Sequence, residues 1–372
     1  MKKLGFGLMR LPLLNPADER SIDLAAFKKM ADAFLYAGFT YFDTASVYHQ
    51  GCSETAFREA VVKRYPRDAY TITDKLTMFM VNKEEDLPVF FSGQLERLGV
   101  DFIDYYWLHG LEANSYPKAC KLRAFDFVRR LKEEGKVKHI GFSFHGDAEM
   151  LEEILTLYPD MEYVQIQLNY LDWEDSQVQS RLCYETASRH GKPVIVMEPV
   201  KGGSLASIPE KAEQLLRAYQ PERSAASWAI RFAASPENIM VVLSGMSDIA
   251  QMEDNLSYMA DFQPVNREEL ALIDRARDII QQSIAIPCTA CRYCIEGCPQ
   301  KVAIPDYFSI YNDLKRFGPG QMRNLMRRFN RLAEANGTPA DCIKCGKCEE
   351  RCPQHLTIRK YLEDVADALE AQ

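Results

Sequence analysis

The sequence lacks long apolar runs, a signal-peptide pattern and an excess of positive charge. No stretch of about 18 apolar residues occurs, so we expect no transmembrane helix. Near the N-terminus Arg10 interrupts the apolar stretch too early for a signal peptide, so we expect a cytoplasmic protein. The 53 acidic residues outnumber the 45 basic ones, and the net charge of −8 disfavours nucleic acid as a partner.

A glycine-rich nucleotide-binding loop is also missing. Gly5-Phe6-Gly7 lacks the third glycine and the following helix that complete the G-x-G-x-x-G loop of Rossmann domains. No flavin fingerprint is present either. A dinucleotide, if one binds, must therefore be held by another arrangement.

One cysteine motif, which we call the cysteine phrase, occurs twice near the C-terminus. Both copies read C-x2-C-x2-C-x3-C-P, the spacing that holds cubane iron–sulfur clusters in ferredoxins. The cysteines are Cys288, Cys291, Cys294 and Cys298 in the first copy, and Cys342, Cys345, Cys348 and Cys352 in the second. Zinc and disulfides are the alternatives, although zinc sites usually pair two C-x-x-C knuckles. Thiolate ligands also suit the reducing cytoplasm.

The phrase predicts which cysteines share a cluster. In two-cluster ferredoxins the fourth cysteine of each run ligates the other cluster. We therefore expect one 4Fe-4S cluster on Cys288, Cys291, Cys294 and Cys352, and another on Cys342, Cys345, Cys348 and Cys298. Residues 300–341, between the phrases, read as two basic helices broken at residues 318–320. Such charge is usually a solvated helix face, and the alternative is a docking surface for an acidic protein electron donor or acceptor.

Before the cysteines, short apolar runs alternate with amphipathic helical patterns. The predicted strands are 3–8, 40–43, 70–75, 103–108, 137–143, 163–167, 193–197 and 240–244. Helical patterns lie between them, and several end at a glycine, as helices do at their C-terminal caps. Eight such units in about 250 residues predict a (β/α)8 TIM barrel rather than an open doubly wound sheet. We assign the barrel to residues 1–282 and a small, mostly α-helical, ferredoxin-like domain to residues 283–372.

Four polar residues follow the predicted strands, at the barrel end where catalytic residues gather. Asp43, Lys75 and His109 end the second, third and fourth strands, and Tyr48 lies on the loop after Asp43. Singly, each could be a cap, a surface charge, a core residue or loop packing. Together they predict a proton donor, because an ammonium lowers the pKa of a neighbouring tyrosine and an aspartate holds that ammonium in place. A neutral histidine can orient a substrate carbonyl.

These residues stand in a recognisable order. The stretches Phe42-Asp43-Thr44-Ala45-x-x-Tyr48, Ser53-Glu54, Lys75-Leu76 and Leu108-His109 resemble the aldo-keto reductase signature. The resemblance covers about residues 1 to 280, and the whole chain resembles the bacterial subgroup with a C-terminal ferredoxin-type domain. It implies a nicotinamide cofactor, NADP or NAD, and a small-molecule carbonyl substrate. Tyr48 would be the acid/base, Lys75 and Asp43 its tuners, and His109 the carbonyl orienter.

The same resemblance implies a cofactor site. Ser143 and Gln165 match residues that hold the nicotinamide amide, and Met197 replaces the usual stacking tyrosine. The matching residues of the phosphate loop are Gly245, Ser247, Gln251 and Asn255. This loop lacks the arginine that often grips a 2′-phosphate, so NADP and NAD both stay open. Lys201 is an alternative cation by its placement in the sequence.

The predicted nicotinamide and the predicted iron–sulfur clusters carry electrons in different ways, so more than one function is consistent with the sequence. A nicotinamide moves two electrons as a hydride, a cubane cluster moves one, and joining them normally takes a flavin. We expect an NAD(P)H-dependent reductase that converts a carbonyl to an alcohol, or the reverse, with two 4Fe-4S clusters for electron transfer. The alternative is an iron–sulfur electron-transfer or redox-sensing subunit whose barrel has little carbonyl reductase activity.

Overall fold

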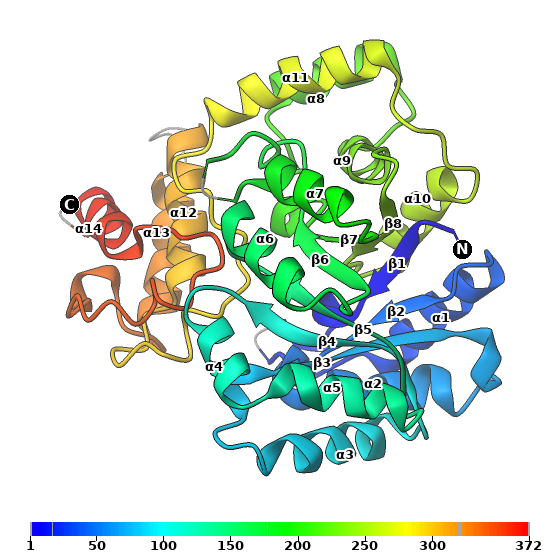
Figure 1. Ribbon diagram of the computed structural model, residues 1–372. Coiled ribbons are helices and arrows are strands. Elements are labelled where there is room, and N and C mark those ends of the chain that lie inside the picture. The colour runs from blue at the N-terminus through cyan, green and yellow to red at the C-terminus, as the bar shows by residue number, and fades with distance from the viewer. Residues whose placement is uncertain (1, 17, 177, 318–321, 371–372) are drawn as a thin grey trace. The chain divides into compact units, whose positions relative to one another are not determined.

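The computed structural model describes residues 2–16, 18–176, 178–317 and 322–370 (Figure 1). The chain forms two compact units. The barrel unit consists of Met1–Val200 and Ala226–Leu270, and the cluster unit consists of Lys201–Ala225 and Ala271–Gln372. The segment Lys201–Ala225 thus interrupts the barrel sequence and belongs with the cysteine phrases. The domain boundary placed after residue 282 stays a prediction.

The barrel unit is a closed barrel of eight parallel strands in sequence order, as the predicted (β/α)8 fold requires (Figure 1). The strands are β1 (Leu4–Gly7), β2 (Tyr41–Asp43), β3 (Thr71–Thr77), β4 (Ile103–Leu111), β5 (Val137–Phe144), β6 (Tyr163–Gln167), β7 (Val194–Met197) and β8 (Ile239–Ser244). Each overlaps the strand predicted for it. Closure comes from β1, which pairs with β2 on one side and with β8 on the other.

Helices surround these strands. They are α1 (Leu24–Tyr36), α2 (Ser53–Phe57), α3 (Asp86–Leu98), α4 (Ser115–Lys121), α5 (Ala124–Glu133), α6 (Ala148–Leu157), α7 (Ser180–Arg189), α9 (Ala225–Ala234) and α10 (Ile249–Met259). Aspartates cap several of their N-termini: Asp23, Asp147 and Asp248 each accept a backbone N–H of the first turn. Gly99 ends α3 in the left-handed conformation that glycine adopts without strain.

The barrel unit has an inner and an outer core. The inner core fills the barrel with Tyr41, Tyr105, Trp107, Ile195, Val241 and Leu243. The outer core packs the strands against the helices, for example Phe34 of α1 against Phe42 of β2, with ring centroids 5.1 Å apart. Alternate residues of each strand therefore serve different cores, and the polar residues at one barrel end are the exceptions to this apolar pattern.

The cluster unit is mostly helical. It holds α8 (Glu210–Tyr219), most of α11 (Arg267–Gln281), α12 (Ile304–Phe317), α13 (Met322–Ala333) and α14 (Ile358–Leu369). The two helices predicted between the cysteine phrases are α12 and α13, while the break predicted at residues 318–320 lies outside the described residues. A separate core of residues such as Val302, Tyr307, Phe308 and Val365 holds this unit together.

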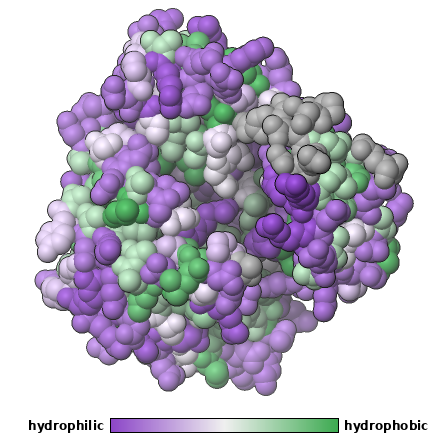
Figure 2. All heavy atoms as spheres, turned by 180° about the vertical axis from the view of Figure 1, so that it is seen from behind, coloured by the Kyte–Doolittle hydropathy of each residue, from purple (hydrophilic) through white to green (hydrophobic). Residues whose placement is uncertain are grey.

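Polar side chains dominate the face shown in Figure 2, where apolar residues are scattered in small groups. This distribution is ordinary for a surface that faces water. Within the described part of the chain, no helix combines the length and the apolar character that a membrane crossing needs.

Candidate active site and cluster sites

The structure brings Asp43, Tyr48, Lys75 and His109 together at one end of the barrel. Asp43 is the last residue of β2, and Tyr48 begins a short 3-10 turn, Tyr48–Gly51, on the loop that follows. One detail of the prediction was wrong. Strands β3 and β4 do not end at Lys75 and His109 but continue to Thr77 and Leu111, so both side chains stand on regular strand backbone. That backbone fixes them more firmly than a loop could.

A buried ion pair anchors this group. The ammonium Nζ of Lys75 lies 2.6 Å from Asp43 Oδ1 and donates a second hydrogen bond to the backbone oxygen of Thr44, also at 2.6 Å. Lys75 and Asp43 are only 1% and 2% exposed. Burial raises the pKa of Asp43, and the charge of Lys75 partly opposes that rise. Each charge therefore depends on the other to remain inside the protein.

Tyr48 receives the third hydrogen bond of Lys75. The ammonium lies 3.3 Å from the phenolic oxygen and 4.8 Å from the centre of the ring. The sequence predicts that this ammonium lowers the pKa of Tyr48, but the surroundings of the phenol act in the opposite direction. Burial first, and then the carboxylates of Asp43, Asp74 and Glu198, raise the pKa of Tyr48 well above its usual value. The phenol therefore keeps its proton near neutral pH and can act as a proton donor.

His109 is positioned by Thr77, the last residue of the neighbouring strand. Its Nδ1 lies 3.1 Å from Thr77 Oγ1, and its ring stands nearly perpendicular to that of Tyr48, with centroids 6.2 Å apart. Burial, followed by the charges of Lys75 and His145, lowers the pKa of His109 well below its usual value. A neutral imidazole whose Nδ1 accepts from the threonine presents an N–H at Nε2, which is the donor that a substrate carbonyl needs.

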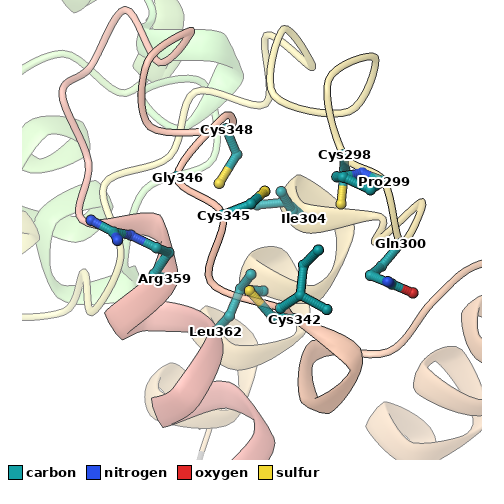
Figure 3. Close-up of a pocket in the computed structure, with 11 residues that line it drawn as sticks. Cys298, Pro299, Gln300, Ile304, Cys342, Cys345, Gly346, Cys348, Arg359 and Leu362 are labelled. Atoms are coloured by element: carbon teal, nitrogen blue, oxygen red, sulfur yellow. The ribbon is translucent and has the colours of Figure 1, made fainter.

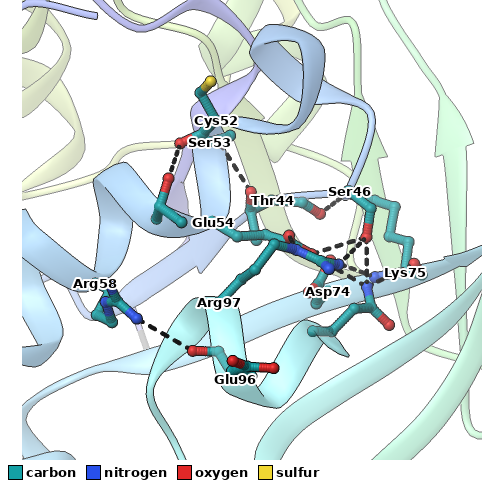
Figure 4. A network of polar contacts seen from close by, with 12 residues as sticks. Thr44, Ser46, Cys52, Ser53, Glu54, Arg58, Asp74, Lys75, Glu96 and Arg97 are labelled. Atoms are coloured by element: carbon teal, nitrogen blue, oxygen red, sulfur yellow. Dashed lines mark hydrogen bonds and ion pairs between the residues drawn. The ribbon is translucent and has the colours of Figure 1, made fainter. Parts of the chain in front are cut away.

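A buried polar network supports the strand that carries Lys75 (Figure 4). Glu54, at the start of α2, accepts from Ser46 at 2.8 Å and from Arg97. Gln94 donates to Ser46 and to the backbone oxygen of Lys75, both at 3.0 Å. Glu54 is fully buried, so the Ser53-Glu54 part of the sequence signature belongs to this network.

The neighbouring carboxyl group of Asp74 is unusual. Burial first, and then the adjacent Glu54, raise the pKa of Asp74 well above its usual value. Burial beside Glu54 therefore favours the protonated form of the Asp74 carboxyl group. Apart from the position of Glu54, no sequence pattern indicated this network.

Two of the predicted cofactor residues lie on adjacent strands, directly opposite each other. Ser143 of β5 pairs in register with Gln165 of β6, and both side chains are almost fully buried. The hydroxyl of Ser143 accepts the backbone N–H of Gly110 at 2.8 Å. Gln165 Oε1 has no hydrogen-bond partner among the described residues. Since a buried acceptor rarely stays unpaired, this oxygen fits the amide N–H of a nicotinamide.

The loop after β8 carries Gly245 and Ser247, and α10 carries Gln251 in its first turn and Asn255 near its middle. Gln251 Oε1 accepts the backbone N–H of Ser247 at 2.9 Å, and Asn255 donates to Ser244 at 2.7 Å. Both side chains thus stabilise the loop itself. A helix N-terminus after strand eight is a usual phosphate site in TIM barrels.

Arg10 is a residue that sequence analysis missed at this loop. Its backbone oxygen accepts from the Ser247 hydroxyl at 2.9 Å. A Cβ atom added to Gly245 would stand 3.3 Å from Arg10 Cδ, so the arginine side chain runs along the glycine. Because β1 pairs with β8, closure of the barrel brings together two loops that are far apart in the sequence. Pairing of the first and last strands is the signal that could have indicated Arg10.

Met197 and Lys201, both proposed to lie near the cofactor, belong to different units of the structure. Met197 is the last residue of the strand and pairs in register with Gln167. Lys201 belongs to the cluster unit, where its ammonium lies 3.3 Å from Gln354 Oε1. The structure thus gives Lys201 a partner other than the cofactor phosphate considered for it.

Two hollows in the cluster unit match the two predicted ligand sets. Four cysteines line the first hollow: Cys288, Cys291, Cys294 and Cys352. Four others line the second: Cys298, Cys342, Cys345 and Cys348. Figure 3 shows the sulfur atoms of the second hollow directed toward the space that they share. Each set takes three cysteines from one phrase and the fourth from the other, which is the crossed arrangement predicted from the spacing.

The two phrases repeat their backbone as well as their sequence. Residues 54 positions apart share a left-handed conformation: Ala290 and Lys344, Arg292 and Gly346, and Lys301 and His355. Hydrogen bonds repeat too, since Cys298 N–H donates to Ile295 and Cys352 N–H to Glu349. Left-handed residues among right-handed ones turn backbone N–H groups toward one concave side, a geometry common at phosphate and iron–sulfur sites.

Each hollow offers four cysteines, the number that a cubane cluster needs, since each thiolate of a cubane binds a different iron. In the described parts of the chain, no three His, Cys, Asp or Glu side chains converge on a point suited to a single ion. Burial first, and then the neighbouring cysteines, raise the pKa of Cys294, and burial raises that of Cys348 to about 11.

Known proteins agree with this geometry. The aldo/keto reductase family matches residues 3–278, and a 4Fe-4S dicluster domain matches residues 287–357. An uncharacterized oxidoreductase of Schizosaccharomyces pombe is 24% identical over 269 residues, which are 69% of this chain and 81% of the yeast protein. A probable aldo-keto reductase of Glycine max is 33% identical over 156 residues, which are 38% of this chain and 41% of the plant protein.

Solved structures share the barrel fold. An aldo-keto reductase of Bacillus halodurans in its holo form has a TM-score of 0.59 at 24% identity, covering 74% of this chain and 91% of that one. An aldo/keto reductase of Klebsiella pneumoniae in complex with NADP and acetate has a TM-score of 0.57 at 20% identity, with 73% and 90% covered. The chain is therefore an oxidoreductase-type barrel that belongs to the aldo/keto reductase family and carries a 4Fe-4S dicluster domain in its C-terminal part.

Proposed function

We propose that the barrel unit reduces a small aldehyde or ketone to an alcohol, or runs the reverse reaction, with NADP or NAD. The observation that carries this proposal is the contact of one buried ammonium, Lys75 Nζ, with both Asp43 and the hydroxyl of Tyr48. A bound nicotinamide would supply a hydride to the carbonyl carbon. The protein then has to provide one proton at the carbonyl oxygen and to hold that oxygen in place.

Each side chain has one role in this proposal. Tyr48 donates its proton to the carbonyl oxygen, and Lys75 stabilises the phenolate that remains. Asp43 keeps the ammonium charged and aimed, because it is the buried counter-charge of Lys75. His109 donates from Nε2 to the same oxygen and remains neutral. Asp43 and Lys75 are buried and Tyr48 and His109 are half-buried, so little water reaches the group and its electrostatic interactions are strengthened.

The cofactor would lie across the ends of β5 to β8. Ser143 and Gln165 would hold the nicotinamide amide, with Met197 beside the ring, and the loop of Gly245, Ser247, Gln251 and Asn255 would receive the phosphates. Arg10 is the nearby cation that could pair with a phosphate. NADP in a Klebsiella pneumoniae relative supports NADP as the first cofactor to test, with NAD as the alternative.

We further propose that the cluster unit holds two 4Fe-4S clusters on the crossed cysteine sets. They would pass single electrons to or from a protein partner. Reduced thiolates of this kind favour a compartment such as the cytoplasm. A second function, an iron–sulfur electron-transfer or redox-sensing subunit, is favoured by the same two hollows, since transfer of a hydride needs no cluster.

Anaerobic purification followed by a Tyr48→Phe comparison tests the proposal. We expect about eight irons per chain with broad visible absorbance. The parent should oxidise NADPH or NADH when an aldehyde is added, and Tyr48→Phe should lower that rate about 10²–10⁴-fold. Tyr170→Phe is the control, because this buried hydroxyl has no hydrogen-bond partner in the described structure. Equal rates in parent and Tyr48→Phe would end the reductase proposal and leave the electron-transfer subunit.

A further inference from the structure

The two cluster hollows differ at one pair of equivalent residues. Each phrase closes with Cys-Pro-Gln, so Gln300 and Gln354 occupy the same position in the repeat. Each glutamine lines one hollow, Gln300 the second and Gln354 the first. Gln300 is exposed, whereas Gln354 is only 6% exposed. The exposed Gln300 can therefore serve as the control when the effect of the buried Gln354 amide on its cluster is measured.

Contact with Lys201 accompanies the burial of Gln354. Lys201 comes from the segment Lys201–Ala225 of the cluster unit and is only 4% exposed, with its Nζ 3.3 Å from Gln354 Oε1. The adjacent Gly202 has φ 64°, and a Cβ atom there would stand 2.0 Å from the backbone oxygen of Thr289. Thr289 is 1% exposed, while its equivalent in the second phrase, Ile343, is 58% exposed. The segment thus covers the first phrase and leaves the second one open.

The contact fixes which end of the Gln354 amide faces the lysine. An ammonium has only donors, so it must meet the amide oxygen and not the nitrogen. The NH2 group is then the other end of the side chain. Gln354 Nε2 is buried and has no hydrogen-bond partner among the described residues. A buried donor of this kind, in a residue that lines a hollow of four cysteines, is suited to a sulfur acceptor of the cluster.

We propose that Lys201 and Gln354 act as a relay that raises the reduction potential of the first cluster. This inference rests on the proposed two-cluster function. Reduction adds one electron and no proton to the cluster, so it increases the negative charge in the hollow. An N–H directed at cluster sulfur and a cation behind it both stabilise that charge. Burial alone acts in the opposite direction, because it disfavours the more negative state. The relay offsets this cost where the hollow is covered.

Redox titration with dithionite, followed by electron paramagnetic resonance, tests the relay on the intact chain. The parent should give two one-electron waves. Gln354→Leu should move one wave to lower potential by the equivalent of at least a tenfold change in its reduction equilibrium, about 59 mV. The other wave should stay in place. Gln300→Leu, the matched control in the second hollow, should move neither wave to this extent.

Lys201→Met should move the same wave as Gln354→Leu, and the double variant should move it less than the sum of the two. Should Gln354→Leu fail to retain its iron, Gln354→Glu keeps the shape and the acceptor for Lys201 but removes the donor, and it too should lower the wave. Unchanged waves in iron-loaded variants, or an equal shift with Gln300→Leu, would overturn the relay alone. A parent chain that binds no iron would overturn the cluster proposal itself, so the two failures can be told apart.

Discussion

In the barrel unit, the candidate active site gathers four side chains from three strands and a loop, and the strand residues Asp43, Lys75 and His109 lie more than 30 positions apart in the sequence. In the cluster unit, each hollow takes three of its four cysteines from one continuous phrase. The first site exists only when β2, β3 and β4 are paired in the barrel, while the second depends mainly on local turns of the backbone. We therefore expect a substitution in the barrel site to lower both stability and activity, and a substitution in one hollow to affect only the cluster bound there.

The largest expected effect follows from breaking the buried ion pair of the barrel. In Lys75→Met the carboxylate of Asp43 would stay buried without its partner, which typically costs about 3–5 kcal/mol. Burial raises the pKa of Asp43, so protonation relieves this cost as the pH falls. The rate of carbonyl reduction should fall about 10²–10⁴-fold, because Tyr48 loses the cation beside it. Urea denaturation and NADPH oxidation measure the two effects.

Lys138→Met is the control for that substitution. The side chain of Lys138 is 53% exposed, and its partner Asp104 keeps a second ion pair with Arg67 at 2.6 Å. Its removal should cost less than about 1 kcal/mol and leave the rate unchanged. A similar loss of stability in both variants would mean that burial of the Lys75 pair carries no special cost.

The second prediction concerns the cysteines. Cys291→Ser and Cys345→Ser should each remove one cluster, so the iron content should fall from about eight to about four per chain. Carbonyl reduction should be unchanged in a folded variant, since hydride transfer needs no single-electron carrier. Iron analysis and NADPH oxidation on the same samples check both parts. A rate that falls together with the iron would reveal an obligatory electron route between the units and contradict the expectation that a substitution in one hollow affects only the cluster bound there.

The same difference explains what could be predicted from the sequence. The eight strands and the crossed cysteine sets were predictable because apolar periodicity and ligand spacing are local patterns. The gathering of Asp43, Tyr48, Lys75 and His109 followed from their positions near strand ends. Their roles, however, stay predictions until they are tested by variants.

Long-range contacts account for what was missed. The pKa of Tyr48 rises rather than falls because of burial first, and then because the carboxyl groups of Asp43, Asp74 and Glu198 lie near it. The burial and the position of Glu198 depend on the fold and were not visible in the sequence. Arg10 reaches the loop after β8 only because β1 and β8 close the barrel. The segment Lys201–Ala225 reads as part of the barrel, yet it belongs to the cluster unit through contacts such as that of Gly202 with Thr289.

A smaller effect is expected from one glycine of this segment. Gly202→Ala would place a Cβ atom 2.0 Å from the Thr289 backbone oxygen at a positive φ, so the segment must move away from the first hollow. Gly135→Ala has a similar φ of 71° but meets nothing within 4 Å, so it carries only the cost of the left-handed conformation, about 1 kcal/mol. Thermal unfolding and iron release should show a larger loss for Gly202→Ala. Equal losses would show that the close approach to Thr289 is not needed.

The smallest expected effect is a pH profile that stays flat. Burial lowers the pKa of His109 well below its usual value near 6.5, so the imidazole is neutral across the physiological range. Burial and three carboxylates raise the pKa of Tyr48, so its phenol stays protonated until well above its usual value. Reduction needs the neutral histidine and the protonated tyrosine, and so its rate should show no inflection near pH 6.5 and should decline only at strongly alkaline pH. Oxidation of the alcohol needs the phenolate instead, so its rate should rise with pH over the same range. An inflection near pH 6.5 that disappears in Thr77→Val would mean that His109 titrates there and that the threonine hydroxyl, rather than burial, controls its charge.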